Sequence, residues 1–141
     1  MNPEAPKVKS DLAALMARIE GEPIATHLNL KIIEVSPGFA KVSMKMRPEY
    51  INFNGMVFGS IIMAAADHAL SLAINALVLP SVSSQFNMHF FSPAAAEDEL
   101  TAECKVLKSG RRMGICEMTV TNQNGKVIAK GTATTIPLAD K

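Results

Sequence analysis

Hydrophobic residues dominate one long stretch of the chain, from Val57 to Leu79, in which Asp67 is the single formally charged side chain. A helix formed by this stretch is apolar on nearly every side, which predicts that it lies buried in the middle of the fold. The stretch is about as long as the ~20 residues that a bilayer core requires. Polar Ser60, Ser71 and Asn75, and the absence of a basic or aromatic flank, favour a buried helix of a soluble protein over a membrane span.

On both sides of this stretch, hydrophobic and polar residues alternate or form short apolar runs between turn residues, which predicts β-strands. From Ala40 to Met46, even-numbered side chains are apolar and odd-numbered ones are polar, so one face is expected to be dry and the other wet. Pro37-Gly38 and Asn124-Gly125 are typical of tight hairpin turns, and the chain also reverses near Ser109-Gly110. The predicted strands cover residues 28–36, 39–46, 82–91, 100–106, 116–121 and 126–136.

The N-terminal part is expected to be a loose leader over residues 1–10, followed by one short helix over 11–20 with Ser10 as its N-cap. We expect residues 1–23 to hold this leader and helix, and residues 24–141 to form a single domain. The predicted order is a helix, two strands, one long buried helix and four strands. This order favours an α+β fold, in which one antiparallel sheet curls around the central helix.

Composition narrows the possible classes of protein. The chain has 141 residues, of which 48% are hydrophobic and 19% charged, with a formal net charge of +1. These values predict one hydrophobic core and favour neither a disordered chain nor a nucleic-acid-binding protein. With two cysteines and no basic-then-apolar segment near the N-terminus, we expect a reduced, cytoplasmic protein.

Asp67 is the first candidate for chemistry, because a carboxylate among apolar neighbours costs free energy unless it is paired or reaches water. The alternatives are a structural cap or an exposed position. Desolvation is expected to raise its pKa above the reference value of ~3.9. A helix that begins near Phe58 also leaves the N–H groups of Gly59 and Ser60 unpaired at the positive end of the helix dipole. Gly59 and Asp67 are about 12 Å apart along a helix, which is too far for both to act on one carbonyl within one chain.

The segment over residues 52–60, Asn-Phe-Asn-Gly-Met-Val-Phe-Gly-Ser, followed by Asp67, resembles a known motif. Hotdog-fold acyl-CoA thioesterases of the phenylacetate-degradation (PaaI-like) type have Asn, two residues, Gly, two residues, His-Gly-Gly, six residues and Asp. The resemblance extends over roughly residues 24–136. Further matching segments are residues 36–40, 47–48, 91–94, 110–111 and 124–131.

The resemblance implies a hotdog fold and hydrolysis of an acyl-CoA thioester to a free acid and coenzyme A, without a metal or redox cofactor. It also implies a homodimer with shared active sites, and both a dimer and a homotetramer built from two such dimers fit the sequence. Asp67 is then the base or nucleophile, the N–H of Gly59 is the oxyanion donor and Asn52 positions the substrate. Ser83, with Ser84 as the alternative, orients water. The expected substrate-binding residues are Asn54, Gly55, Phe58, Ser60, Ser84, Gly110, Arg111 and Arg112, the last three with Lys108 near the coenzyme A phosphates.

Two residues depart from the family pattern, because Phe58 stands where the family has His and Ser60 where it has the second Gly. These changes are compatible with slower catalysis, an altered substrate, or a noncatalytic acyl-CoA-binding or scaffold protein. Other candidate residues also have purely structural interpretations. Asn52 and Asn54 could make hydrogen bonds within a turn, and Ser83 could be a half-exposed strand residue. The basic tip, Lys108, Arg111 and Arg112, could be a solvated hairpin.

The histidines and cysteines do not suggest a further catalytic site. His68 follows Asp67, but neighbouring helix residues point about 100° apart, so the two form no simple acid–base pair, and a hydratase-like arrangement does not match. His27 is expected in a loop. The spacing of the histidines, Cys104 and Cys116 disfavours a zinc site, and both cysteines are expected on the packed face of neighbouring strands. The methionines expected to line an acyl pocket are Met56, Met63 and Met88.

Overall fold

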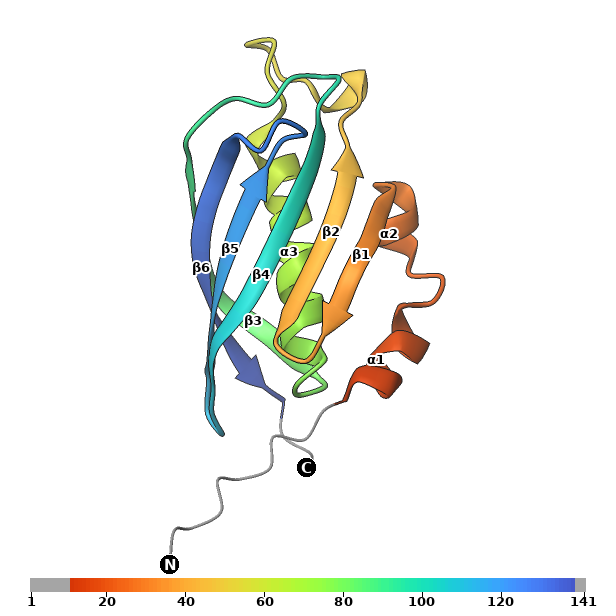
Figure 1. Cartoon of the computed structure of the whole chain (residues 1–141), viewed down its shortest axis with the longest axis vertical. Helices are drawn as coiled ribbons and strands as arrows, with labels where there is room; N and C mark the ends of the chain where they lie inside the picture. Colours follow the sequence, from red (N-terminus) through yellow and green to blue (C-terminus); the bar gives the residue numbers. More distant parts are fainter. Residues whose placement is uncertain (1–10, 139–141) are drawn as a thin grey trace, which may run out of the picture.

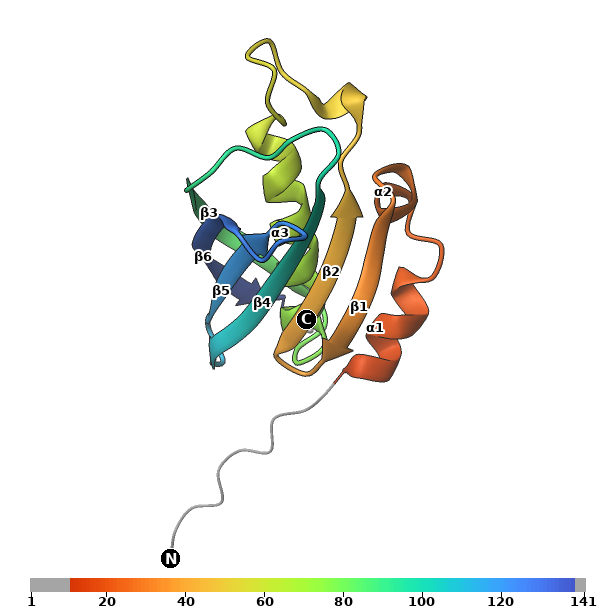
Figure 2. The same cartoon turned by 45° about the horizontal axis from the view of Figure 1, so that its top comes forward.

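One antiparallel sheet wraps around a single long helix in the computed structural model, which describes residues 11–138 (Figures 1 and 2). The sheet order is β1-β2-β4-β5-β6-β3, and every neighbouring pair is antiparallel. The predicted α+β architecture is confirmed, whereas the expected leader and the Ser10 cap lie outside the described residues. The strands are β1 Leu30–Ser36, β2 Phe39–Lys45, β3 Ser81–Phe90, β4 Glu99–Ser109, β5 Gly114–Thr121 and β6 Val127–Pro137.

The core lies between the concave face of the sheet and α3 (Gly59–Asn75), which packs mainly on β2, β4 and β5. Alanines of α3, among them Ala65, Ala66, Ala69 and Ala73, are fully buried and let the helix backbone approach the strands. The dry face predicted for β2 is confirmed. The predicted wet face is partly wrong, because Ser43 is only 5% exposed between its cross-strand neighbours Lys31 and Thr101. Cys104 and Cys116 are buried on the packed face, as expected.

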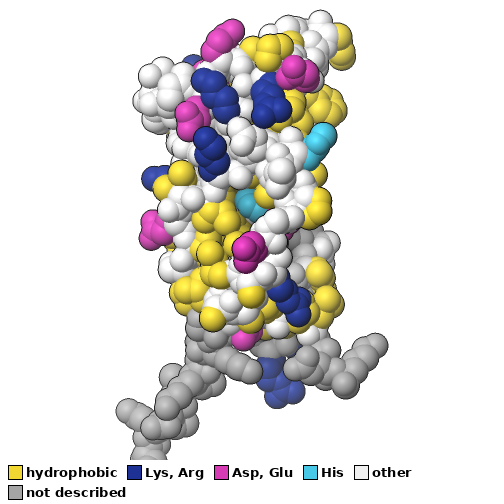
Figure 3. Space-filling view, turned by 90° about the vertical axis from the view of Figure 1, so that its right-hand side faces the viewer, with side chains coloured by type: hydrophobic (Ala, Val, Ile, Leu, Met, Phe, Trp, Pro, Cys, Tyr) yellow, Lys and Arg dark blue, Asp and Glu magenta, His cyan; other side chains and the backbone are white. Residues whose placement is uncertain are grey.

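The N-terminal segment contains two helices, α1 (Leu12–Ile19) and α2 (Pro23–His27), which lie beside β1 (Figure 2). The second helix corrects the expectations that this segment holds one short helix over residues 11–20 and that His27 lies in a loop. Proline is favoured at the first helical position, because its missing N–H has no intrahelical partner there. Figure 3 shows this side of the molecule, where hydrophobic side chains and histidine gather. None of the helices within residues 11–138 is long and apolar enough to cross a membrane.

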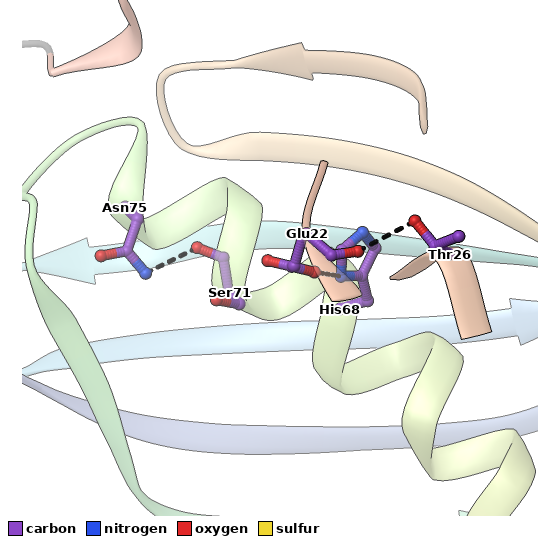
Figure 4. Close-up of polar contacts among 5 residues, drawn as sticks. All are labelled: Glu22, Thr26, His68, Ser71 and Asn75. Carbon is purple, nitrogen blue, oxygen red and sulfur yellow. Dashed lines mark hydrogen bonds and ion pairs between the residues drawn. The ribbon is translucent and has the colours of Figure 1, made fainter. Parts of the chain in front are cut away.

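The helix α3 ends at Asn75 rather than just before Pro80, and the Asn75 side chain binds the start of β3. Its Nδ2 donates to the carbonyl oxygen of Ser71 at 2.8 Å (Figure 4). The same Nδ2 donates to the carbonyl oxygen of Ser81 at 3.3 Å, and its Oδ1 accepts the N–H of Ser81 at 2.8 Å. Asn75 is buried. The amide therefore ties the last turn of α3 to the start of β3. Two groups that a longer helix would pair are bonded elsewhere: the Ala73 carbonyl accepts the N–H of Gly38 at 3.2 Å, and the N–H of Leu79 donates to Asp11 Oδ2 at 2.9 Å.

Replacing Asn75 with alanine is expected to lower the free energy of unfolding by about 3 kcal/mol, because it leaves buried backbone groups of Ser81 without a partner. Urea denaturation measures this loss. Asn87→Ala is the matched control, since its Nδ2 donates to Thr132 Oγ1 at a site exposed to solvent. Its expected loss is below about 1 kcal/mol. Equal losses in the two variants would contradict the role given to Asn75.

Candidate active site

Asp67 lies in a hollow of about 440 Å³ between α3 and β3. The hollow is lined by Ser60, Met63, Ala64, Asp67, Ser83 and Phe86. The Asp67 carboxylate is exposed in the single chain, yet burial by its apolar neighbours raises its pKa, while His68 acts in the opposite direction. The predicted direction of this shift is confirmed. A carboxylate that is both accessible and poorly solvated is suited to accept a proton.

A β-bulge in β3 decides which serine meets Asp67. The register with β6 shifts between Ser83 and Gln85, so Ser84 is the extra residue. The Ser84 hydroxyl donates to the carbonyl oxygen of Thr134 at 3.3 Å, whereas Ser83 lines the hollow. The bulge also brings Phe86 to the same side as Ser83, although an unbroken strand would place residues three apart on opposite faces. The structure thus places Ser83, and not Ser84, beside Asp67.

Gly59 lies in a separate hollow of about 290 Å³ at the start of α3. The hollow is lined by Asn52, Met56, Val57, Gly59, Ile62, Phe90, Phe91, Ser92 and Pro93. Phe58 is the N-cap residue and its side chain makes no capping bond. The first N–H groups of the helix therefore carry the positive end of the helix dipole without a helical acceptor. A Cβ on Gly59 would lie 3.4 Å from the Phe90 ring, so this ring borders the helix start closely.

The residues before α3 form a turn held by Asn52. Its Oδ1 accepts the N–H groups of Asn54 and Met56, at 2.9 and 3.2 Å, and its carbonyl accepts the N–H of Gly55 at 3.0 Å. Gly55 has a φ of +76°, which glycine adopts without strain. Asn52 thus makes the turn bonds considered as an alternative and also lines the Gly59 hollow. Asn54 and Gly55 are exposed and line neither hollow.

The two residues that depart from the family motif have different surroundings. The Phe58 side chain is 52% exposed and lines neither hollow, while its backbone N–H donates to the Tyr50 carbonyl at 2.8 Å. Ser60 lines the Asp67 hollow, but its hydroxyl does not cap the helix. The substitution of His by Phe therefore presents an exposed aromatic ring next to the helix start.

The basic hairpin tip lies near the opposite end of α3. The N–H of Gly110 donates to the Met113 carbonyl at 2.9 Å, and Arg111 and Arg112 are exposed. A Cβ on Gly114, at the start of β5, would lie 3.2 Å from Cδ1 of Ile74 in the last turn of α3. Within one chain, the structure therefore brings this tip to neither hollow.

Sequence reasoning missed several residues that border the two hollows. Phe86 and Phe90 come from β3, and their placement depends on the bulge and on the sheet register. Of the three methionines expected at an acyl pocket, Met56 and Met63 line the hollows, whereas Met88 packs on the core. No local pattern distinguishes these positions, so only the sheet pairing could have found them.

A curled antiparallel sheet around one central helix, with a glycine at the helix start and an isolated carboxylate two turns later, defines a hotdog-fold protein of the thioesterase class. The sequence model of the thioesterase superfamily matches residues 54–129. The chain belongs to this superfamily of thioester hydrolases and is PaaI-like, as the motif over residues 52–67 predicted.

Individual relatives agree with this assignment. Over 113 residues the chain is 31% identical to acyl-coenzyme A thioesterase PaaI of Escherichia coli strain K12, covering 80% of this chain and 81% of that protein. Over 105 residues it is 27% identical to acyl-coenzyme A thioesterase 13 of Homo sapiens, covering 72% and 75%. The solved structure of the E. coli PaaI protein matches with a TM-score of 0.87 at 28% identity, covering 94% of this chain and 97% of that one.

Proposed function

We propose that this protein hydrolyses an acyl-CoA thioester to a free acid and coenzyme A, in active sites shared by two copies of the chain. The observation that carries the proposal is the division of the motif residues and Ser83 between two hollows, one with Asp67 and Ser83 and the other with Gly59 and Asn52. The superfamily supports thioester hydrolysis, and the name of the E. coli relative supports coenzyme A as the thiol.

The proposed reaction uses residues from both hollows. Asp67 of one chain removes a proton from water as the water oxygen attacks the carbonyl carbon, with the Ser83 hydroxyl orienting that water. The N–H of Gly59 from the other chain binds the oxyanion that forms, and the helix dipole adds to its stabilisation. The C–S bond then breaks, and the thiolate takes the proton from Asp67. In the nucleophilic variant, the Asp67 carboxylate attacks the carbonyl and water hydrolyses the resulting anhydride.

A two-fold arrangement brings the two kinds of hollow together. β3 is an edge strand of the sheet, and it contributes Ser83 to the Asp67 hollow and Phe90 to the Gly59 hollow. In a two-fold contact, residue i of one copy faces residue j of the other, and the reverse also holds. Antiparallel pairing centred between Ser83 and Phe90 therefore places each Asp67 hollow opposite a Gly59 hollow. Such dimers can pair further into the tetramer implied by the resemblance.

The basic tip contributes to the proposal only in an assembly. Lys108, Arg111 and Arg112 lie at the β4–β5 hairpin, at the other end of α3 from Gly59. Arginine and lysine side chains bind phosphate oxygens by charge-assisted hydrogen bonds. In a shared site, this tip of one chain is the proposed contact for the coenzyme A phosphates.

A second candidate function is binding of acyl-CoA without hydrolysis, which the exposed Phe58 ring favours. The family histidine at this position supplies a polar group beside the helix start, and phenylalanine supplies none. Binding without turnover leaves the Asp67 and Gly59 hollows intact but removes one polar contact from the thioester.

A thiol-release assay with a panel of acyl-CoAs tests the two functions. Hydrolysis predicts release of coenzyme A, detected with a thiol reagent, and a loss of release in Asp67→Ala. Tight binding of every acyl-CoA without release from any of them would favour the second function. Thiol release that persists in Asp67→Ala would contradict the mechanism while leaving the overall reaction in place.

A further inference from the structure

His68 turns away from the Asp67 hollow and meets the N-terminal segment. Its side chain is 8% exposed, and its Nδ1 lies 3.5 Å from Oε1 of Glu22, the N-cap residue of α2 (Figure 4). Glu22 Oε1 and His68 Nε2 are both buried without a hydrogen-bond partner. These two residues are 46 positions apart in the sequence. Because His68 directly follows Asp67, their contact joins the start of α2 to α3 next to the candidate base.

Stability of the core does not account for this pair. Burial is the largest influence on His68 and holds its pKa below the ordinary value, although the carboxylates of Glu22 and Asp67, the charged groups that face it, act in the opposite direction. Buried polar atoms without partners destabilise a fold. The contact is therefore better explained by the position that it imposes on α2.

The position of α2 shapes a recess beside Asp67. A hollow of about 200 Å³ is lined by Glu22, Ile24, Leu28, Leu30, Ala64, Asp67, His68 and Ser71. A larger hollow of about 400 Å³ on the outer side of the N-terminal segment shares Glu22, Leu30 and His68 with it. The Glu22–His68 pair thus borders both hollows, and the apolar wall facing Asp67 consists of Ile24 of α2, Leu28 at the C-cap of α2 and Leu30 of β1. Asp67 lines this recess and the hollow that contains Ser83.

We propose that Glu22 and His68 are a positioning pair that holds α2 against α3 as the wall of the recess beside Asp67, and that this wall contributes to binding of the acyl group. The inference rests on the proposed function. Half of the residues lining this recess are polar or charged, and its apolar part, formed by Ile24, Leu28, Leu30 and Ala64, is suited to contact a hydrocarbon chain. Release of α2 would open the recess toward the outer hollow and weaken binding of acyl groups that reach it.

Steady-state kinetics of four variants test the pair. Glu22→Ala and His68→Gln are expected to raise KM for hexanoyl-CoA about tenfold, with kcat within about twofold of wild type, because the pair touches no reacting atom. KM for acetyl-CoA is expected to change less than about threefold, since two carbons reach little of the wall. Glu22→Gln keeps an acceptor oxygen and is expected to restore most of the affinity. The control Glu20→Ala removes an exposed carboxylate two residues away and is expected to behave as wild type.

Amide hydrogen exchange reports the position of α2 separately from catalysis. Faster exchange in residues 23–28 is expected for Glu22→Ala and His68→Gln, with wild-type exchange in Glu20→Ala. A wild-type KM in both pair variants, or an equal rise for acetyl-CoA and hexanoyl-CoA, would overturn the inference. If the wild-type protein hydrolyses no acyl-CoA, the proposed function fails, and unchanged exchange in the pair variants would then overturn the positioning role as well.

Discussion

Replacing Asp67 with asparagine is expected to reduce kcat about a thousandfold and to raise the melting temperature at pH 7. The carboxylate is the only group in its hollow able to accept a proton at neutral pH, and general-base catalysis contributes on the order of 10²–10⁴-fold. The gain in stability has a separate cause. Burial raises the pKa of Asp67 in the fold, so ionising it is less favourable there than in the unfolded chain.

The pH dependence gives this prediction a sharp control. A folded-state pKa above the unfolded value means that the fold loses stability as pH rises through that range and regains it as pH falls. Asparagine has no such dependence. The difference in melting temperature between Asp67→Asn and wild type should therefore be largest at pH 7 and shrink as pH falls toward 4. An inactive Asp67→Asn variant that is no more stable than wild type at pH 7 would contradict the cost of ionising Asp67 in the fold. An active variant would contradict its role as general base.

Replacing Gly59 with proline is expected to reduce kcat about 100- to 1000-fold while preserving the fold. Proline removes the backbone N–H that we assign to the oxyanion, and loss of one such donor has an effect of this size. The first position of a helix tolerates proline, and the preceding Phe58 has an extended backbone, with φ −58° and ψ 128°. Gly59→Ala is the matched control, because it keeps the N–H and adds a Cβ 3.4 Å from the Phe90 ring.

Mixing the two inactive variants tests the sharing of sites between chains. In a dimer of Gly59→Pro with Asp67→Asn, one site receives both substitutions and the other receives neither. Random pairing makes half of the dimers mixed, so co-expression in equal amounts is expected to restore about one quarter of wild-type activity. No recovery, despite mixed dimers shown by mass spectrometry, would contradict the sharing of active sites between the two chains. Equal activity of Gly59→Pro and Gly59→Ala would remove the oxyanion role from the N–H.

Local sequence patterns predicted most of the fold, because the spacing of apolar and polar residues shows which face of a strand or helix is buried. Alternation over residues 40–46 and 100–106 gave strands whose apolar faces pack on α3, and Pro37-Gly38 and Asn124-Gly125 gave the hairpins. The misses have a common physical cause. The end of α3 involves bonds to Asp11 and Gly38, and the burial of Ser43 depends on the adjacent strands, so both rest on residues distant in sequence that no local pattern encodes.

The candidate site was predictable where its residues lie on one helix. The spacing of Gly59 and Asp67 on α3 follows from helix geometry, and the structure places them in different hollows, as the ~12 Å separation required. Ser83 could not be distinguished from Ser84 before the bulge was known. The contact between Glu22 and His68 joins segments 46 residues apart and leaves no periodic signal in the sequence.

The placement of Gly59 and Asp67 on one rigid helix also limits how this protein can evolve. Inserting or deleting a residue between them would rotate one group by about 100° relative to the other and alter both symmetric sites of an assembly at once. Adaptation to new acyl groups is therefore easier in segments outside that interval, such as α2 and the start of β3, which border the hollows without setting this spacing. We expect natural variants with new substrate ranges to differ mainly there, and to keep the length of α3 between residues 59 and 67 unchanged.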